Sequence, residues 1–159
     1  MVYIYMVGQC LKRNTIYQAT VAEEPSGKVE TYIGLASTTW KERLAVHKSS
    51  MKHRPKPQAK SQNGTELSTH TWKLKDQGIT YKLNWKLIDR AQAFNPSTKN
   101  CRLCLTEKYH LMYSEGAATL NKRSEFYTAC RHKKKMLISN GWDDPCAFIP
   151  FTFSDHGLV

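Results

Sequence analysis

The chain has 159 residues, a length that suits one domain with a modest hydrophobic core. Its formal net charge of +11 at pH 7 indicates a polyanionic partner. It contains no run of about 18 apolar residues, so no membrane-spanning helix is expected.

The five cysteines are odd in number and unevenly spaced. Residues 1–10 offer neither a basic leader nor an apolar region long enough for a signal peptide. Both features favour a reducing, intracellular compartment, where thiols bind metal or stay reduced, over a disulfide framework. Together with the basic charge they lead us to expect a nuclear protein.

The first predicted unit is a β-hairpin. Two runs rich in β-branched and aromatic residues, 15–22 and 29–35, flank the turn-forming sequence EPSG at 24–27. Residues 1–13 form an apolar start that either adds a strand or is left over from a longer protein.

A helix is predicted directly after the hairpin. The sequence STT at 37–39 offers an N-cap, and the helix then places Arg43 and His47 four residues apart on one face. Basic residues dominate 41–60, and prolines at 55 and 57 break any helix there, so residues 49–64 are predicted as an extended basic loop.

The second half of the chain is predicted to alternate helices with one strand. Residues 79–87 alternate apolar and polar side chains without a break, which is typical of a strand with one buried face. In the helix before it, Leu67, Thr71 and Leu74 fall on one side. The predicted elements are a helix from 65 to about 78, the strand at 79–87, a loop at 91–100, and helices at about 102–113 and 124–138.

The hairpin and its following helix carry an unusual set of side chains for a core. Tyr17 and Tyr32 lie one on each strand, and Arg43 and His47 follow on the helix. Cleavage of a phosphodiester needs an activated water and neutralisation of the charge that builds on the phosphoryl group. Two phenols, an imidazole and a guanidinium that stays protonated suit this task.

Each of these residues also has a structural interpretation. Tyr17 can be a core tyrosine, because a phenol of pKa about 10 is a poor base near neutral pH unless neighbouring cations lower that value. His47 can be a surface histidine, and Asn121 can simply form a turn. Glu107 stands among apolar neighbours, where an unpaired carboxylate is costly unless it ligates a cation.

Several short motifs follow one another along the chain in a recognisable order. They are Thr15-Ile16-Tyr17, Tyr32-Ile33-Gly34, Trp40, Arg43, Leu44, His47, Glu107 within CLTEKYHLM and Asn121 within TLNKRSE. Together they resemble the motifs of the GIY-YIG nuclease superfamily, and the resemblance covers about residues 12–137. Thr15 stands where that family usually has Gly, but the tyrosine of the motif is kept, and the gap between the two tyrosines is slightly long.

The resemblance implies an α+β (α/β) fold, with a small three-stranded antiparallel sheet flanked by helices. It implies one nuclease domain at 1–140, with 141–159 as a C-terminal tail. It further implies that Tyr17 acts as general base or orients the water, that Glu107 holds one Mg²⁺ or Mn²⁺, and that Asn121 positions Tyr17 or the glutamate. Tyr32 and Arg43 would grip the phosphate, with His47 bonding Tyr17 or the phosphate.

Four soft ligands suggest a second, structural metal. Cys101 and Cys104 form a C-x2-C pair, and Cys130 and His132 form a C-x-H pair, enough for a closed tetrahedral Zn²⁺ site. His110 is a possible substitute for His132, and coincidence among buried cysteines is the alternative. A zinc-bearing domain of this kind resembles the endonuclease modules of Penelope-like retroelements.

The expected partner is DNA, although basic runs are often only solvated faces or nuclear import signals. A metal-dependent DNA endonuclease is the preferred interpretation. The alternatives are a catalytically inactive, zinc-containing nucleic-acid-binding module and an RNA-directed enzyme. The predicted phosphate contacts are Lys48, Lys52, Arg54, Lys56, Lys60, Arg131, Lys133, Lys134 and Lys135.

Overall fold

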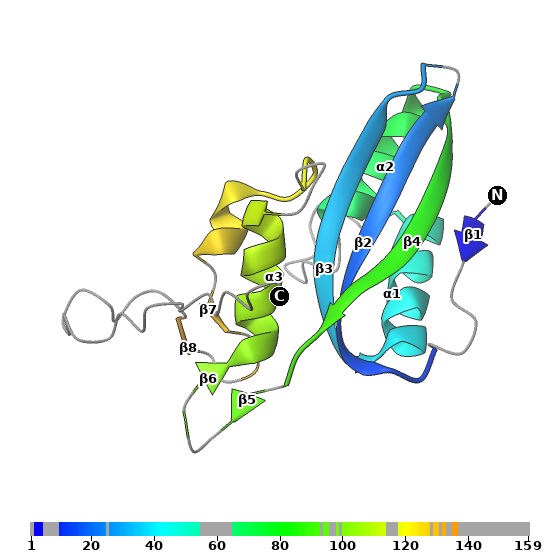
Figure 1. The fold of residues 1–159 in the computed structure, drawn as a ribbon. Helices are drawn as coiled ribbons and strands as arrows, with labels where there is room; N and C mark the ends of the chain where they lie inside the picture. The colour runs from blue at the N-terminus through cyan, green and yellow to red at the C-terminus, as the bar shows by residue number, and fades with distance from the viewer. Residues whose placement is uncertain are drawn as a thin grey trace, which may run out of the picture.

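A computed structural model gives the fold shown in Figure 1. It describes residues 2–4, 10–24, 26–54, 65–92, 94–95, 98, 100–113, 118–127, 129–130, 132 and 135–136. The predicted tail at 141–159 therefore lies outside the described residues.

Three long strands form the centre of the molecule. β2 (Arg13–Glu24) pairs antiparallel with β3 (Val29–Thr39) on one side and with β4 (Thr80–Arg90) on the other. The short β1 (Val2–Ile4) pairs in parallel with β4, which gives the order β1-β4-β2-β3 (Figure 1). The predicted α+β class, with a three-stranded antiparallel sheet flanked by helices, is confirmed, and the apolar start does add a strand.

The hairpin is longer than its apolar pattern predicts. Backbone pairing continues at its open end as far as Arg13 opposite Thr39, so the polar residues 37–39 still belong to a strand. At the closed end Gly27 has φ +69°, a conformation that L side chains rarely adopt, which accounts for glycine in this turn. β4 likewise runs to Arg90, three residues beyond the alternating pattern.

Thr39 begins α1 (Trp40–Lys52) with a capping box. Its hydroxyl accepts a hydrogen bond from the main chain of Glu42, whose carboxylate accepts one from the main chain of Thr39. The N-cap predicted at 37–39 is confirmed. The prediction of a loop from residue 49 is wrong for 49–52, because a proline at 55 restricts only the residue before it and leaves the helix free to continue to Lys52.

The next two helices follow the prediction closely. α2 (Glu66–Asp76) begins at the N-cap Thr65, and Leu67, Thr71 and Leu74 are buried as expected. α3 (Arg102–Tyr113) matches the predicted helix at 102–113. The loop before it contains two short paired strands, β5 (Phe94–Asn95) and β6 (Asn100–Cys101).

The predicted helix at 124–138 is wrong. A 3₁₀ turn, η1 (Arg123–Phe126), is followed by β7 (Ala129–Cys130), which pairs antiparallel with β8 (Lys135–Met136). A helix would point residues 130 and 132 to opposite sides and stack like charges along the RHKKK run, whereas the hairpin brings Cys130 and His132 together.

The sheet separates two hydrophobic clusters because neighbouring residues of a strand point to opposite faces. Tyr17 and Trp85 face α1 and α2 and pack with Trp40. Ile16 faces α3 and packs in a cluster with Leu103 and the cysteines. Figure 1 shows α1 and α2 behind the sheet and α3 beside β3. The two faces of one hairpin thus carry the two candidate sites described next.

Candidate active site and metal centre

In the first candidate site, two side chains form hydrogen bonds with the hydroxyl of Tyr17. It lies 2.7 Å from Nε2 of His47 and accepts a hydrogen bond from Nε of Arg43 at 3.0 Å. Both partners come from α1, one turn apart, so the spacing that the sequence placed on one face of a helix delivers both groups to a single oxygen. Arg43, His47 and Tyr17 therefore form one hydrogen-bonded triad.

The triad is buried, and burial sets its protonation. The pKa of Tyr17 is raised: burial is the largest cause, the Arg43 guanidinium acts against it, and the carboxylate of Glu107 acts with it. Arg43 does act on Tyr17 as a nearby cation would, but the condition for a good base is not met, because Tyr17 is fully buried and desolvation dominates its pKa. The phenol is protonated at neutral pH.

His47 is neutral in this site. Burial, with the charge of Arg43, lowers the pKa of His47 to about 3. Its side chain is fully buried, so the interpretation of His47 as a surface histidine is wrong. Its Nδ1 has no hydrogen-bond partner among the described residues.

Tyr32 stands beside the triad with its ring centroid 6.4 Å from that of Tyr17. Burial raises the pKa of Tyr32 well above its ordinary value. The neighbouring Tyr17 and the carboxylates of Glu125 and Glu107 act in the same direction, and Arg43 acts against them. For Arg43, burial lowers the pKa, but the neighbouring Tyr17, Tyr32 and Glu107 together raise it by more. The two phenols and the guanidinium thus share one electrostatic environment.

Two tryptophans enclose the ring of Tyr17. The centroid of Trp40 lies 4.9 Å from it and that of Trp85 lies 5.8 Å from it. Trp40 belongs to the motif that the sequence identified, but Trp85 was missed as a site residue. The alternation at 79–87 could have placed Trp85 on the buried face of its strand. That pattern does not distinguish a site residue from an ordinary core residue.

Glu107 lies on α3, which packs beside β3 (Figure 1), and Asn121 bonds β3 itself. Glu107 is half-buried on α3, and its charge acts on Tyr17, Tyr32 and Arg43. Asn121 donates to the Ile33 carbonyl and accepts from the Ile33 amide, both at 2.8 Å, so it holds the main chain next to Tyr32 instead of bonding Tyr17 or Glu107.

Two neighbours of these residues were not singled out from the sequence. Nδ2 of Asn121 also donates to Glu125 at 2.5 Å, and Nζ of the buried Lys108 donates to the Glu125 carbonyl. The sequence motif around Asn121 contains Glu125, but nothing in its spacing distinguishes that residue from a surface acid.

The second site is the group of Cys101, Cys104, Cys130 and His132. Their ligand atoms all lie within 4.8 Å of one another. Nδ1 of His132 is 3.4 Å from Sγ of Cys101 and 3.3 Å from Sγ of Cys104, and the Sγ atoms of Cys104 and Cys130 are 3.5 Å apart. The predicted fourth ligand, His132, is in the group.

These distances suit one tetrahedral ion. Zinc bonds of about 2.3 Å to sulfur and about 2.0 Å to nitrogen place neighbouring ligands roughly 3.5–3.8 Å apart. Burial raises the pKa of Cys101 and that of Cys104, where the adjacent thiols add to the effect. A cation at the centre would offset the cost of three buried thiolates, so the group could hold a metal such as zinc.

His110, the proposed substitute ligand, is engaged elsewhere. Its Nε2 lies 3.0 Å from a carboxylate oxygen of Asp89 on β4. The Asp89 carboxyl has a lowered pKa, chiefly because of this hydrogen bond. His110 is therefore not a member of the Cys/His group.

The basic surface is partly described. Arg54 pairs with Asp76 and lies over the ring of Trp72 at 5.4 Å, and Lys75 lies 4.1 Å from the same centroid, which adds a cation from α2 that the sequence did not single out. Lys48, Lys52 and Arg54 are exposed, the backbone alone is described for Lys135, and Lys56, Lys60, Arg131, Lys133 and Lys134 lie outside the described residues.

Comparisons with known proteins yield no match to any family model, curated protein or solved structure. None of the helices that the structure describes combines the length and apolar character needed to cross a membrane.

Proposed function

We propose that this protein is a metal-dependent endonuclease that hydrolyses DNA phosphodiester bonds, related to the GIY-YIG superfamily. The observation that carries the proposal is the convergence of Arg43 and His47 on the hydroxyl of Tyr17, with the charge of Glu107 acting on both Tyr17 and Arg43. Tyr17, the pair Arg43 and His47, and Glu107 come from three separate parts of the sequence and are the residues that the family resemblance selects.

Arg43 suits the task of binding the scissile phosphate. One of its five N–H donors goes to Tyr17, and its terminal nitrogens can contact phosphate oxygens and neutralise charge in the transition state. His47, being neutral, serves to hold the Tyr17 hydroxyl in place. Because it is fully buried, Tyr17 would act through Arg43, whose Nε–H it accepts, a role that does not need a phenolate.

Glu107 would hold the divalent cation, Mg²⁺ or Mn²⁺. A single half-buried carboxylate, completed by waters and substrate oxygens, is an ordinary site for Mg²⁺. The cation would supply Lewis-acid stabilisation of the phosphoryl oxygens and a more acidic bound water. Within the chain, Asn121 fixes the β3 main chain beside Tyr32, which keeps the second phenol in register with the first.

The Cys/His group would hold a structural Zn²⁺ in this proposal. It joins the start of α3 to the β7–β8 hairpin. Glu107 lies on the same helix, within two turns of Cys101 and Cys104. Such a clamp would fix α3 relative to the sheet. A zinc-bearing domain of this kind also fits an origin in, or descent from, a Penelope-like retroelement.

Cleavage of supercoiled plasmid with Mg²⁺ or Mn²⁺ tests the proposal. The parent protein should produce nicked or linear product, and Glu107→Gln should lose this activity while keeping its fold by circular dichroism. Glu24→Gln, at a half-buried glutamate that pairs with Lys82 at the end of β2, is the matched control and should cut normally. Equal cleavage by Glu107→Gln and the parent would refute the site.

Full burial of Tyr17 favours a second candidate, a catalytically inactive nucleic-acid-binding module. A phenol with a raised pKa and a neutral histidine can persist as core residues that hold α1 against the sheet. This candidate predicts DNA binding without cleavage under every divalent-metal condition. Gel-shift and plasmid assays run on the same preparation separate the two candidates.

A further inference from the structure

The outer face of α3 is apolar beyond its first residue, the exposed Arg102. Glu107, Lys108 and His110 are buried or half-buried, the reverse of an ordinary surface helix. We call the exposed residues the α3 stripe: Leu105 is 47% exposed, Tyr109 55%, Met112 60% and Tyr113 66%. They are spaced four, three and one residues apart, so they share one side of the helix.

The two tyrosines of the stripe form a ready platform. Their ring centroids lie 5.2 Å apart with the planes tilted by 37°, and both rings remain largely accessible. Exposed aromatic rings with sequence-tolerant π faces are the groups on which unpaired bases stack in single-strand-binding proteins. In a double helix the bases are already stacked on each other, so this platform favours unpaired nucleotides.

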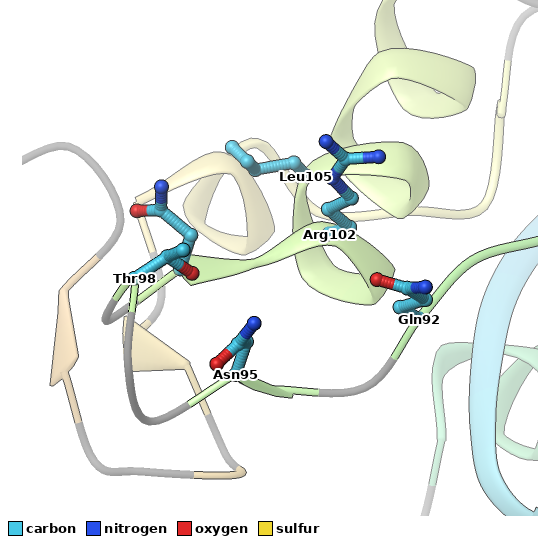
Figure 2. A pocket seen from close by; sticks show the side chains of 6 residues that line it. Gln92, Asn95, Thr98, Arg102 and Leu105 are labelled. Atoms are coloured by element: carbon cyan, nitrogen blue, oxygen red, sulfur yellow. The ribbon is translucent and has the colours of Figure 1, made fainter.

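A polar hollow continues the stripe at the start of the helix. It encloses about 220 Å³ and shares Leu105 with the stripe. Figure 2 shows the amides of Gln92 and Asn95 and the guanidinium of Arg102 around this space. Carboxamides and arginine are the side chains that read the edges of bases and bind phosphate. Its remaining lining residues are Thr98 and Asn100.

We infer that the α3 stripe and this hollow together bind a short single-stranded segment of nucleic acid. The helix has twelve residues, about 18 Å, which at 3.4 Å per stacked nucleotide corresponds to about five nucleotides. Charge selects the occupant: the chain carries +11, and the stripe and hollow contain Arg102 but no carboxylate. An apolar protein partner would leave Arg102 and the amides unmatched.

This inference shares with the proposed function the premise that nucleic acid is the partner, but it concerns a surface distinct from the Tyr17 site. A nuclease with such a surface would prefer DNA in which a few unpaired nucleotides lie beside a duplex. Substitutions in α3 and at the Tyr17 site should therefore affect nucleic-acid binding and DNA cleavage separately, and the two activities are measured in separate assays.

Fluorescence anisotropy with a labelled dT12 strand and a 12-base-pair duplex provides the test. The parent should bind dT12, and Tyr109→Ala/Tyr113→Ala should bind it at least about tenfold more weakly, because the variant loses both rings on which bases would stack. Tyr109→Phe/Tyr113→Phe keeps the rings and should retain binding. Arg102→Gln should weaken binding and flatten its salt dependence.

Plasmid cleavage by the same variants keeps the two proposals apart. Glu107→Gln should retain dT12 binding even if it no longer cuts. The loss of dT12 binding in Tyr109→Ala/Tyr113→Ala would support the inference even if the parent protein never cuts DNA. Unchanged dT12 affinity in the double alanine variant would overturn the inference. The inference would also be overturned if the double alanine variant still bound dT12 but had a different mass from the parent by light scattering. The stripe would then join two copies of the chain.

Discussion

Gly34 on β3 lies directly against the hydroxyl end of Tyr17. A Cβ atom built on Gly34 would stand 2.6 Å from the Tyr17 oxygen, 2.7 Å from its Cζ and 3.0 Å from the Tyr32 ring. Real Cβ atoms do not approach so closely, and the Tyr17 ring is itself enclosed by Trp40 and Trp85. The absence of a side chain at Gly34 is therefore what lets Tyr17 reach its two partners on α1.

Gly34→Ala should displace Tyr17 and break its hydrogen bonds to Arg43 and His47. Overpacking of a full core costs about 1–3 kcal/mol, so the denaturant midpoint should fall and any cleavage activity should be lost. Gly27→Ala is the comparison: its φ of +69° disfavours alanine by about 1 kcal/mol, but nothing lies within 4 Å of the added atom. It should lose stability and keep activity. Similar activity loss in both variants would count against a specific role for Gly34.

Tyr17→Phe should destabilise the protein although the ring is kept. It leaves Nε2 of the buried His47 without its partner at 2.7 Å and removes an acceptor from Arg43. An unsatisfied buried polar group costs about 1–3 kcal/mol, a loss that urea unfolding resolves. Tyr113→Phe removes a hydroxyl from an exposed ring and should be neutral. A Tyr17→Phe variant as stable as the parent would show that the triad adds nothing to folding.

The strand patterns and the motif order predicted most of the sheet and the first helix. Alternation at 79–87 and the two β-branched runs are local signals, and their pairing follows from the hairpin turn. The residues that converge on Tyr17 were found through helical spacing and family resemblance. Their burial was not predicted, because it depends on Trp40 and Trp85, which arrive from different elements.

For Cys130 and His132, the sequence predicted the side chains' role correctly but the local backbone wrongly. The sequence identified Cys130 and His132 as ligands but assigned them to a helix, in which residues two apart cannot face one ion. Ligand spacing was therefore the better guide to the backbone than the apparent helical run. The role of Asn121 was also non-local: it bonds the main chain of Ile33, 88 residues away.

Removal of metal should unfold the α3 end of the protein. Zinc held by three cysteines and a histidine contributes directly to folding, so a strong chelator should lower the melting temperature and release about one zinc per chain. Cys104→Ser should purify with less zinc and melt earlier. Cys10→Ser changes an exposed cysteine outside the group and should behave like the parent. Protein purified without chelator that contains no zinc would contradict this prediction.

The stability of the fold should fall in acid because of His47. Its pKa is about 3 in the folded protein against about 6.5 when unfolded, so below pH 6.5 only the unfolded chain takes up this proton. The contribution is complete above pH 6.5 and is lost toward pH 3, with a slope of up to about 1.4 kcal/mol per pH unit. The free energy of unfolding, measured with urea between pH 7.5 and 4.5, should therefore fall less steeply with falling pH for His47→Gln than for the parent. His53→Gln, at the exposed C-cap of α1, is the control for loss of a histidine outside the triad. Parallel pH profiles for His47→Gln and the parent would mean that this imidazole is not buried in its neutral form.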